Sequence, residues 1–477
     1  MSKTDPSPAQ AVAGATAVAE NAFARLPLSA SMQSNLQQLG YLAMTPIQSA
    51  SLPLALAGRD LIAQAKTGSG KTAAFALPLL HNLNPRRFAV QALVLCPTRE
   101  LADQVTQEIR RLARAEDNIK TLTLCGGVPL RNQLTSLAHG AHIVVGTPGR
   151  ILDHLSRQSL ALDALNTLVL DEADRMLDMG FADDIAQVAQ ACPATRQTLL
   201  FSATYPEGVS KLAARFLRNP QEVKLTERHA ATKIRQRFYE VKDTERLHAV
   251  SLLLNHFRPV STLAFCNTKL RCRELVAVLQ AQGFAALELH GDLDQRERDQ
   301  VLVQFANRSC SVLVATDVAA RGLDIAQLEA VINVDITPDP EVHTHRVGRT
   351  GRADGEGWAF SLASMDEMGS VGRIDAMQGS ESPWHALSEL SDADNTAPLQ
   401  PPMVTLQIVG GRKEKIRPGD VLGALTKDLG FAGSQIGKIN VNEFSTYVAV
   451  ERSVADAVLR GLNTGKVKGK SVKVRRL

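Results

Sequence analysis

Short runs rich in valine, leucine and isoleucine recur along this chain, and polar or charged residues follow each run directly. Continuous apolar runs that alternate with helical patterns are typical of buried parallel strands in an α/β sheet. The runs fall in the segments 92–101, 142–150, 167–174, 198–204, 262–268, 312–324 and 330–335. Because open parallel sheets bind ligands at the carboxyl ends of their strands, we expect these polar clusters along a common edge.

The length of 477 residues is too great for one hydrophobic core, so several domains are expected. A polar stretch at 218–238 interrupts the strand pattern and predicts two α/β lobes, at 22–220 and 230–375. Residues 382–402 are rich in Ser, Asp and Pro and predict a flexible connector, within a linker at 376–403. Residues 404–477 then follow a βαββαβ order, which is that of a small ferredoxin-like domain.

Composition excludes several classes of protein. No apolar run approaches the ~18 residues that a membrane span needs, so no membrane partner is expected. The Ala-rich residues 1–21 have no leucine-rich segment and predict a flexible tail rather than a signal peptide. Six scattered cysteines without a CxxC pair argue against zinc and disulfides and favour a cytoplasmic protein. Nothing in the sequence indicates an oligomeric state.

Positive charge is concentrated in the C-terminal domain. Residues 404–477 hold 14 Lys and Arg against 6 Asp and Glu, a balance of +8, whereas the whole chain is only +4. The remaining residues therefore sum to −4. Such an excess indicates either a polyanionic partner or a surface that serves solubility alone.

A glycine-rich stretch at 65–72 lies between an apolar run and an apolar helical pattern. It matches the phosphate-binding loop template except that Ala65 replaces the first glycine. Gly68 and Gly70 can still turn backbone N–H groups toward phosphate oxygens. Lys71 is expected to reach the β- and γ-phosphates, and Thr72 to bind Mg²⁺. The alternative is a simple glycine-rich turn.

Two adjacent carboxylates, Asp171 and Glu172, end the apolar run at 168–170. A Mg²⁺ ion held by Thr72 needs a carboxylate from a second strand, and Asp171 supplies it. Glu172 is then placed to orient or deprotonate the attacking water. Asp174 is expected to orient a partner across the cleft. Taken alone, acidic residues after a strand could equally cap a helix.

The motifs taken together resemble the DEAD-box RNA helicases over residues 22–375. Residues 171–174 read Asp-Glu-Ala-Asp, and the other matching motifs occur in the family's order at 97–101, 126–127, 147–150, 202–204, 315–324 and 345–352. The resemblance implies two tandem RecA-like parallel-sheet lobes followed by an RNA-recognition (RRM-like) domain. It also implies an enzyme that couples RNA-stimulated ATP hydrolysis to local unwinding of RNA.

The resemblance assigns nucleotide and coupling roles. ATP-binding residues would be Phe23, Tyr41, Gln48, Ala65, Lys66, Thr67, Gly68, Ser69, Gly70, Lys71, Thr72 and Asp324. Gln48 would read adenine, because a carboxamide offers both a donor and an acceptor. Arg349 and Arg352 match arginine fingers, supplied by the second lobe to phosphates held by the first. His345 and Arg346 would link the lobes to the water-activating site, and Asp174, Ser202 and Thr204 would couple nucleotide state to strand separation.

The resemblance also implies an RNA track that contacts phosphates and 2′-hydroxyls rather than bases. In the lobes it consists of Thr98, Arg99, Gly127, Thr147, Pro148, Gly149, Arg150, Gly291, Gln295, Arg298, Thr316 and Asp317. Specificity would then come from the C-terminal domain, which resembles that of bacterial members directed to 23S ribosomal RNA and large-subunit (pre-50S) assembly. Tyr447 is the obvious stacking aromatic there, and the expected cationic contacts are Arg412, Lys413, Lys415, Lys466, Lys468 and Lys470.

Two other functions stay open at this point. An ATP-gated RNA clamp would bind RNA without useful unwinding, although the complete set of catalytic residues argues for turnover. A translocating DNA helicase would be stimulated equally by DNA and RNA. The helicase hypothesis predicts that RNA, through its 2′-hydroxyls, is the preferred activator.

Overall fold

The computed structural model describes residues 23–65, 68–205, 207–224, 234–320, 328–351, 356–393 and 397–477. The expected N-terminal tail at 1–21 lies outside these residues. Contacts divide the chain into two units, of which the first carries strands β1–β7 and the second carries β8–β18. We call the first unit lobe 1. Within the second unit, we call the part with strands β8–β14 lobe 2 and residues 403–477 the C-terminal domain.

Lobe 1 is built on a parallel sheet in the order β3-β4-β2-β5-β6-β1-β7. Each apolar run predicted as a strand in this part is one. The strands are β1 (Leu61–Gln64), β2 (Ala92–Leu95), β3 (Thr121–Leu124), β4 (Ile143–Gly146), β5 (Thr167–Asp171), β6 (Gln197–Ser202) and β7 (Gln221–Lys224). The helices are α2 (Ala30–Gln38), α3 (Pro46–Leu56), α4 (Lys71–His81), α5 (Arg99–Leu112), α6 (Leu130–Ala138), α7 (Pro148–Ser156), α8 (Ala173–Asp178), α9 (Ala182–Gln190) and α10 (Glu207–Phe216).

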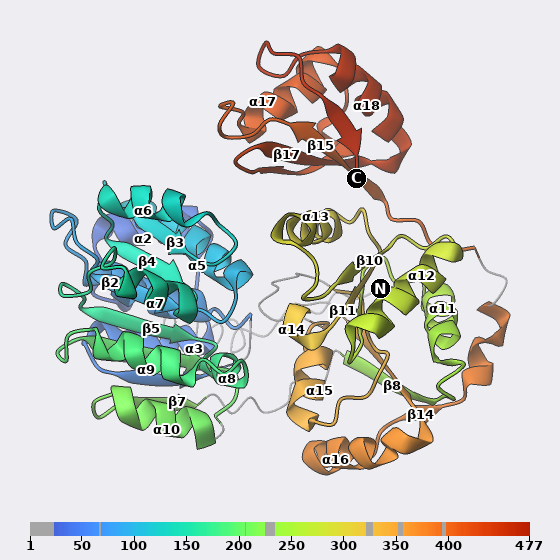
Figure 1. Cartoon of the computed structure of the whole chain (residues 1–477), viewed down its shortest axis with the longest axis horizontal. Coiled ribbons are helices and arrows are strands. Elements are labelled where there is room, and N and C mark those ends of the chain that lie inside the picture. Colours follow the sequence, from blue (N-terminus) through green and yellow to red (C-terminus); the bar gives the residue numbers. More distant parts are fainter. Residues whose placement is uncertain are drawn as a thin grey trace, which may run out of the picture. The chain divides into compact units, whose positions relative to one another are not determined.

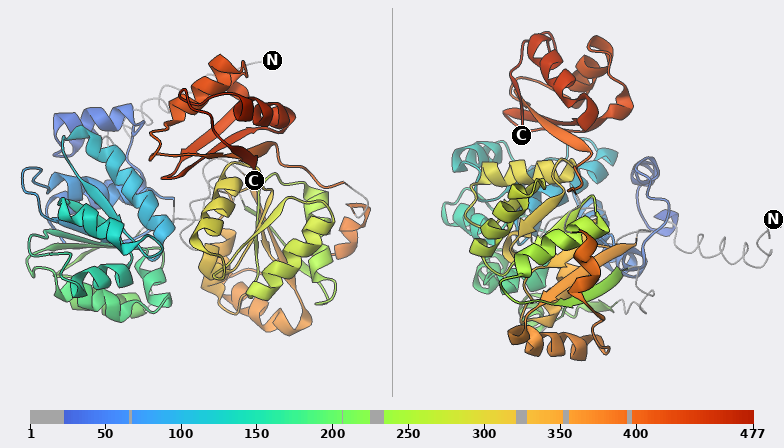
Figure 2. Two further views of the ribbon diagram at one scale, coloured as in Figure 1. Left: turned by 45° about the horizontal axis from the view of Figure 1, so that its top comes forward. Right: turned by 90° about the vertical axis from the view of Figure 1, so that its right-hand side faces the viewer.

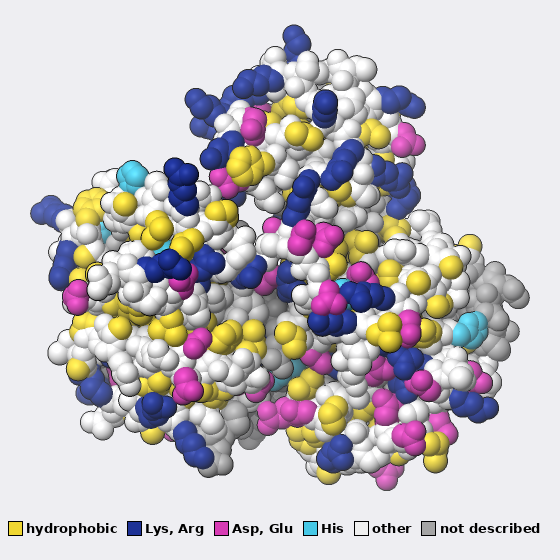
Figure 3. All heavy atoms as spheres, viewed as in Figure 1, with side chains coloured by type: hydrophobic (Ala, Val, Ile, Leu, Met, Phe, Trp, Pro, Cys, Tyr) yellow, Lys and Arg dark blue, Asp and Glu magenta, His cyan; other side chains and the backbone are white. Residues whose placement is uncertain are grey.

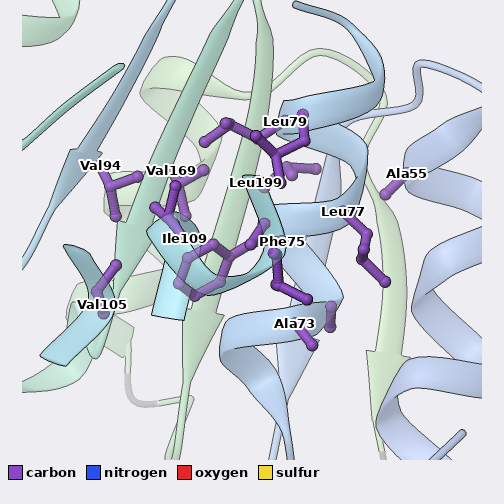
Figure 4. Packing of buried hydrophobic residues seen from close by; sticks show 14 of the residues in the cluster. Ala55, Ala73, Phe75, Leu77, Leu79, Val94, Val105, Ile109, Val169 and Leu199 are labelled. Carbon is purple, nitrogen blue, oxygen red and sulfur yellow. The ribbon is translucent and has the colours of Figure 1, made fainter. Parts of the chain in front are cut away.

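Two apolar clusters cover the two faces of this sheet. One cluster packs α2–α5 against the sheet, and Figure 4 shows α4 and α5 side chains beside Val169 of β5 and Leu199 of β6. Phe75 of α4 meets Phe201 of β6 edge to face, with ring centroids 5.4 Å apart. The other cluster packs α7–α10 against the opposite face. Burial on both faces explains why the strands read as continuous apolar runs.

Lobe 2 repeats this architecture with a parallel sheet in the order β10-β11-β9-β12-β13-β8-β14 (Figure 1). The strands are β8 (Ile234–Glu240), β9 (Thr262–Phe265), β10 (Ala286–Leu289), β11 (Val312–Ala315), β12 (Ala330–Asn333), β13 (Gly357–Ala363) and β14 (Trp384–His385). The helices are α11 (Arg246–Phe257), α12 (Lys269–Ala281), α13 (Gln295–Ala306), α14 (Asp317–Ala320), α15 (Pro340–Val347) and α16 (Met368–Gln378).

The connector predicted at 382–402 differs from the structure over much of its length. Strand β14 adds to the edge of the lobe 2 sheet beside β8, and a 3₁₀ helix follows at Leu387–Ala393. Leu390 is fully buried in the lobe 2 core, which explains the order of this segment. Residues 397–401 also bond to lobe 2 or the C-terminal domain through Ala397, Gln400 and Pro401.

The C-terminal domain has the predicted βαββαβ order and an antiparallel sheet in the order β16-β17-β15-β18 (Figure 2). Its elements are β15 (Met403–Val409), α17 (Pro418–Gly423), β16 (Ile436–Val441), β17 (Ser445–Glu451), α18 (Ala455–Thr464) and β18 (Val474–Arg476). A π-helical turn, Ala424–Asp428, extends α17. Alternate residues of β15 and β17, such as Leu406 and Val448, pack against the two helices in a separate apolar core.

Two observations bear on the compositional expectations. Within the described ranges, none of the helices combines the length and the apolar character that crossing a membrane requires. All six cysteines are buried and free, as expected for a chain without disulfides.

Candidate functional site

The phosphate-binding loop leads from β1 into α4, and Lys71 is the first residue of that helix. The Lys71 Nζ atom donates to the carbonyl of Ala65 at 2.9 Å, so the ammonium group lies over the loop. The Ala65 N–H in turn donates to the Ser202 carbonyl of β6 at 3.0 Å. The open N–H groups at the start of α4 and the Lys71 charge together favour a bound phosphate.

Gln48 fastens the start of α3 to this loop. Its Nε2 atom donates to the Gly70 carbonyl at 3.0 Å, and its Oε1 atom accepts from the Thr45 N–H at 2.9 Å. Each end of the carboxamide can make a second hydrogen bond, so the predicted contact with adenine is compatible with these two. Phe23 and Tyr41 meet edge to face at 6.0 Å near this element. Burial and the hydrogen bond to Glu108 raise the pKa of Tyr41 well above its usual value.

Replacing Gly70 with alanine is expected to weaken ATP binding. Gly70 has φ +92°, and an added Cβ would lie 2.5 Å from Nε2 of Gln48. Relieving this contact displaces the Gln48 carboxamide or the loop, and a displacement that costs about 1–2 kcal/mol is roughly 5–30-fold in an equilibrium constant. The measurement is the Kd for ATP by titration. Gly58→Ala is the matched control, because Gly58 has φ +75° and no neighbour within 4 Å. Equal Kd values for the two variants would contradict the assigned role of Gly70.

Asp171 ends β5 and is buried, and its Oδ1 atom has no hydrogen-bond partner among the described residues. Burial raises the pKa of Asp171 to about 7, and the Lys71 ammonium opposes the rise. An ionised, buried and unsatisfied oxygen is costly unless a cation binds it. This orphaned oxygen, together with the Thr72 hydroxyl at the start of α4, fits the oxygen ligands that Mg²⁺ prefers.

Glu172 follows in a left-handed conformation, with φ +53° and ψ +53°. Its Oε2 atom lies 3.0 Å from Nη1 of Arg175, and both side chains are buried. A non-glycine residue held in this region stores strain, which clusters at active sites. Sequence reasoning missed Arg175, although its i+3 spacing from Glu172 on a helical turn could have indicated the pair.

The three residues expected to couple nucleotide state to strand separation lie together in lobe 1. The Asp174 Oδ2 atom accepts from the Thr204 N–H and from the Thr204 hydroxyl, both at 2.9 Å. The Asp174 N–H donates to the Ser202 hydroxyl at 3.3 Å. Burial acts to raise the pKa of Asp174, but the bonds from Thr204 outweigh it and hold this pKa below its usual value. The acidic turn after β5 is thereby bonded to the turn after β6.

The expected RNA contacts of lobe 1 follow β2, β3 and β4, at the same sheet edge as the phosphate-binding loop. Thr98 caps α5, and Arg99 lies against Gly126, next to Gly127. Arg150 donates to the Val128 carbonyl at 3.2 Å and to Gln133 at 2.9 Å. Because β3, β4 and β2 are neighbours in the sheet, the structure gathers Thr98, Arg99, Gly127, Thr147, Pro148, Gly149 and Arg150 in one region.

Arg346, which was expected to link the lobes, makes four hydrogen bonds inside lobe 2. It is buried and makes a bidentate pair with Asp317, with both N–O distances 2.7 Å. It also donates to the Asn267 side chain at 2.8 Å and to the Asp335 carbonyl at 2.7 Å. These bonds occupy four of the five N–H groups of the guanidinium. Arg346 therefore positions Asp317, which was expected to contact RNA, and sequence reasoning missed Asn267 and Asp335.

The other lobe 2 candidates lie near this pair. Arg298 of α13 donates to the Ala319 carbonyl at 2.7 Å, which ties it to the helix that begins at Asp317. Gly291 lies between β10 and α13, Gln295 is the first residue of α13, and Thr316 follows β11, the neighbour of β10. Arg349, two residues after α15, is buried, and His345 is partly exposed. Lys66, Thr67, Asp324 and Arg352 lie outside the described residues.

In the C-terminal domain, the stacking role expected for Tyr447 disagrees with its position. Its side chain is only 3% exposed, and its hydroxyl accepts a hydrogen bond from Gln407. The cations are placed as expected on the surface. The Lys468 ammonium donates to the Lys415 carbonyl at 2.5 Å, which brings two basic loops together. Exposed residues of these loops are Arg412, Lys413, Lys415, Lys466, Lys468 and Lys470.

A phosphate-binding loop at a helix start, a buried acidic strand end beside it and two repeated parallel-sheet lobes define a RecA-like P-loop nucleoside triphosphatase. Comparison with known families narrows this class. Residues 45–212 match the family model described as DEAD/DEAH box helicase, and residues 245–354 match the helicase conserved C-terminal domain. Residues 405–476 match the DbpA RNA binding domain.

Known proteins agree with these matches. The chain is 52% identical over 444 residues to the ATP-dependent RNA helicase DbpA of Escherichia coli, covering 93% of this chain and 96% of that protein. It is 45% identical to the ATP-dependent RNA helicase CshA of Listeria monocytogenes, over 73% of this chain and 67% of CshA. The structure of S. cerevisiae Dbp5 bound to RNA and ADP BeF3 matches with TM-score 0.72 and 30% identity, over 78% of this chain and 98% of Dbp5.

The chain belongs to the DEAD-box family of ATP-dependent RNA helicases. It is an RNA-stimulated ATPase with a DbpA-like RNA-binding domain.

Proposed function

We propose that this helicase hydrolyses Mg²⁺-bound ATP to unwind or remodel 23S ribosomal RNA locally during assembly of the 50S ribosomal subunit, in the cytoplasm. The observation that carries the choice of RNA is the C-terminal domain, which matches the DbpA RNA binding domain and holds a charge of +8 over residues 404–477. A domain of this charge binds structured RNA and so holds the enzyme on it as a tether, while the two lobes unwind RNA nearby.

In this proposal each group of residues in the ATP site has one task. Lys71 and the N–H groups at the start of α4 bind the phosphates, and Gln48 holds the adenine-side element against the loop. Thr72 and Asp171 would hold Mg²⁺, which neutralises charge on the β- and γ-phosphates when bound. Glu172 accepts a proton from the attacking water. Arg349, with Arg352, stabilises charge on the transferred phosphoryl group.

The remaining residues pass the nucleotide state to RNA. Asp174 is hydrogen-bonded to Ser202 and Thr204. A change at Asp171 or Glu172, which precede Asp174 in the same turn, therefore reaches the turn after β6 through these bonds. In lobe 2, Arg346 fixes Asp317 beside Thr316. The contacts with RNA are to phosphates and 2′-hydroxyls, so the lobes accept any sequence and prefer RNA to DNA.

Removing residues 404–477 is expected to raise the concentration of a 23S ribosomal RNA fragment needed for half-maximal ATPase activity by ~10²-fold or more, because the tether no longer adds to affinity. The maximal rate at saturating single-stranded RNA should change little. The measurement is ATPase activation of both chains across a panel of rRNA fragments, with single-stranded DNA alongside.

Binding of the full chain to the preferred fragment should weaken with salt, with a log–log slope of ~0.7 per neutralised phosphate for a single strand. A shortened chain with unchanged half-activation on every fragment would rule out the tether. Equal activation of the full chain by DNA and RNA would rule out selection through 2′-hydroxyls.

A further inference from the structure

The face of the C-terminal sheet that points away from its helices is closed over most of its area. Alternate residues of β15 and β17 lie on this face, and Gln407 pairs with Tyr447 in the sheet. All of the central ones are buried, namely Thr405, Gln407, Tyr447 and Ala449. The Gln407 amide donates to the Tyr447 hydroxyl at 3.4 Å, and the Arg475 Nε atom donates to Gln407 at 2.7 Å.

Lobe 2 closes the remaining part of this face. The Thr405 hydroxyl accepts from Asn307 at 3.1 Å and lies 2.6 Å from the Ser309 hydroxyl, and the Met403 N–H donates to the Arg308 carbonyl at 3.3 Å. The middle of the face therefore has neither an exposed aromatic ring nor an uncommitted polar side chain among these residues. An RNA base that stacks on this domain needs another surface.

Two large apolar side chains are exposed near one end of the sheet. Val409, the last residue of β15, is 59% exposed, and Phe444, in the turn before β17, is 64% exposed. Val409 pairs with Ser445, the residue after Phe444. Phe444 is therefore an exposed aromatic ring close to the end of strand β15.

The backbone that carries Phe444 is firmly held. The Gly410 N–H donates to the Phe444 carbonyl at 3.1 Å, and the Thr446 hydroxyl donates to the Gly410 carbonyl at 2.8 Å. The Arg412 N–H donates to the Asn442 carbonyl at 2.9 Å, and Gly411 is packed so closely that a Cβ would lie 2.3 Å from that oxygen. The ring is thus presented on a fixed turn, so stacking on it costs little conformational entropy.

One cation lies over this ring, and a second comes from the neighbouring residue. The Lys413 Nζ atom lies 5.5 Å from the centre of the Phe444 ring, and Arg412 is exposed beside it, with its Nε atom bonded to the Val441 carbonyl at 3.1 Å. Lys413 also lies 3.3 Å from Glu443, but both groups are about half exposed, so this ion pair is weak. Figure 3 shows Lys and Arg side chains spread over the visible surface of the domain, with apolar side chains between them.

We propose that Phe444 is a stacking platform for one unpaired RNA base, with Arg412 and Lys413 on the adjoining phosphates. The inference rests on the proposed binding of RNA by this domain and names where a base is held. An aromatic ring beside cations fits an unpaired nucleotide, because the base covers the ring while its phosphate meets the positive charge. The charge of +8 over residues 404–477 favours a polyanion, and RNA supplies both the phosphates and the bases that this arrangement can hold.

The test is binding of the full chain to a fluorescent 23S ribosomal RNA hairpin that carries unpaired nucleotides, at fixed salt. Phe444→Ala is expected to weaken binding by roughly 5- to 150-fold, the range for loss of one stacked base. Phe444→Trp should restore it, because stacking is retained. Phe88→Ala is the matched control, since Phe88 of lobe 1 is 65% exposed and lies outside the C-terminal domain. Arg412→Ala should lower the salt slope, whereas Phe444→Ala should leave this slope unchanged.

The outcomes separate this inference from the proposed function. If the unaltered chain binds the hairpin no better than a simple single strand, the rRNA tether fails and the platform fails with it. If the chain prefers the hairpin but Phe444→Ala binds as tightly as the unaltered chain, only the platform is overturned. The platform is likewise overturned if Phe444→Ala binds naked RNA normally and loses association only with protein-containing pre-50S particles.

Discussion

Replacing Arg349 with lysine is expected to lower the RNA-stimulated rate constant of ATP hydrolysis by ~10³-fold or more, within the range of ~10³–10⁵ for an arginine finger. Lysine keeps the positive charge but loses the planar fork that matches a phosphoryl group. Because the proposed contact forms in the transition state, the affinity for a nonhydrolysable ATP analogue should change little. Single-turnover ATPase kinetics with saturating RNA, together with nucleotide titration, measure both quantities.

Arg346 provides the comparison for this variant. Its guanidinium is bonded to Asp317, Asn267 and Asp335 inside lobe 2, so Arg346→Lys should lower thermal stability as well as RNA binding. A loss of nucleotide affinity in Arg349→Lys as large as its loss of rate would show that Arg349 serves ground-state binding instead.

Replacing Glu172 with glutamine is expected to lower the rate of ATP hydrolysis by ~10²–10⁴-fold, the range for loss of a general base. Glutamine keeps the shape and the hydrogen bond but cannot take a proton from water. ATP and RNA should still bind, so a single round of RNA binding survives while multiple-turnover unwinding of a duplex is lost. Duplex unwinding with excess substrate is the measurement, and unwinding at the unaltered rate would refute the role of Glu172.

The ion pair between Glu172 and Arg175 provides a control that separates loss of the base from loss of stability. Arg175→Gln leaves the buried Glu172 carboxylate without its partner at 3.0 Å, and breaking such a pair costs about 3–5 kcal/mol of stability. The double variant, in which both residues are glutamine, removes the uncompensated charge and should recover much of that stability. Hydrolysis should stay low in the double variant, because the base is absent. Recovered hydrolysis in the double variant would mean that Glu172 acts only through its pairing with Arg175.

The fold could be predicted from the sequence because buried parallel strands have a local signature. Runs such as 167–171 are apolar at every position, since both sheet faces are covered. The same rule placed Lys71 and Asp171 at one edge, and the structure has them close enough for Lys71 to affect the pKa of Asp171. These relations depend on strand direction and sheet edge, which a sequence pattern encodes.

Features that depend on side-chain packing between distant segments could not be predicted in this way. Tyr447 sits on a strand at a position that an exposed sheet face would offer to RNA, but burial of that face removes it. Arg346 lies in a basic stretch, and only the fold brings Asp317 and Asn267 to it. Residues 384–385 lie in the segment predicted to be a flexible connector, yet they form a strand that pairs with β8.

The addition of β14 and the following 3₁₀ helix to lobe 2 shortens the segment that joins lobe 2 to the C-terminal domain. Only residues 394–402 separate Ala393 from Met403, and a segment of that length spans about 30 Å at full extension. The predicted linker at 376–403 would have spanned about 90–100 Å. Because Thr405 of the C-terminal domain also bonds directly to Asn307 of lobe 2, an RNA held by this domain would be presented to lobe 2 at short range.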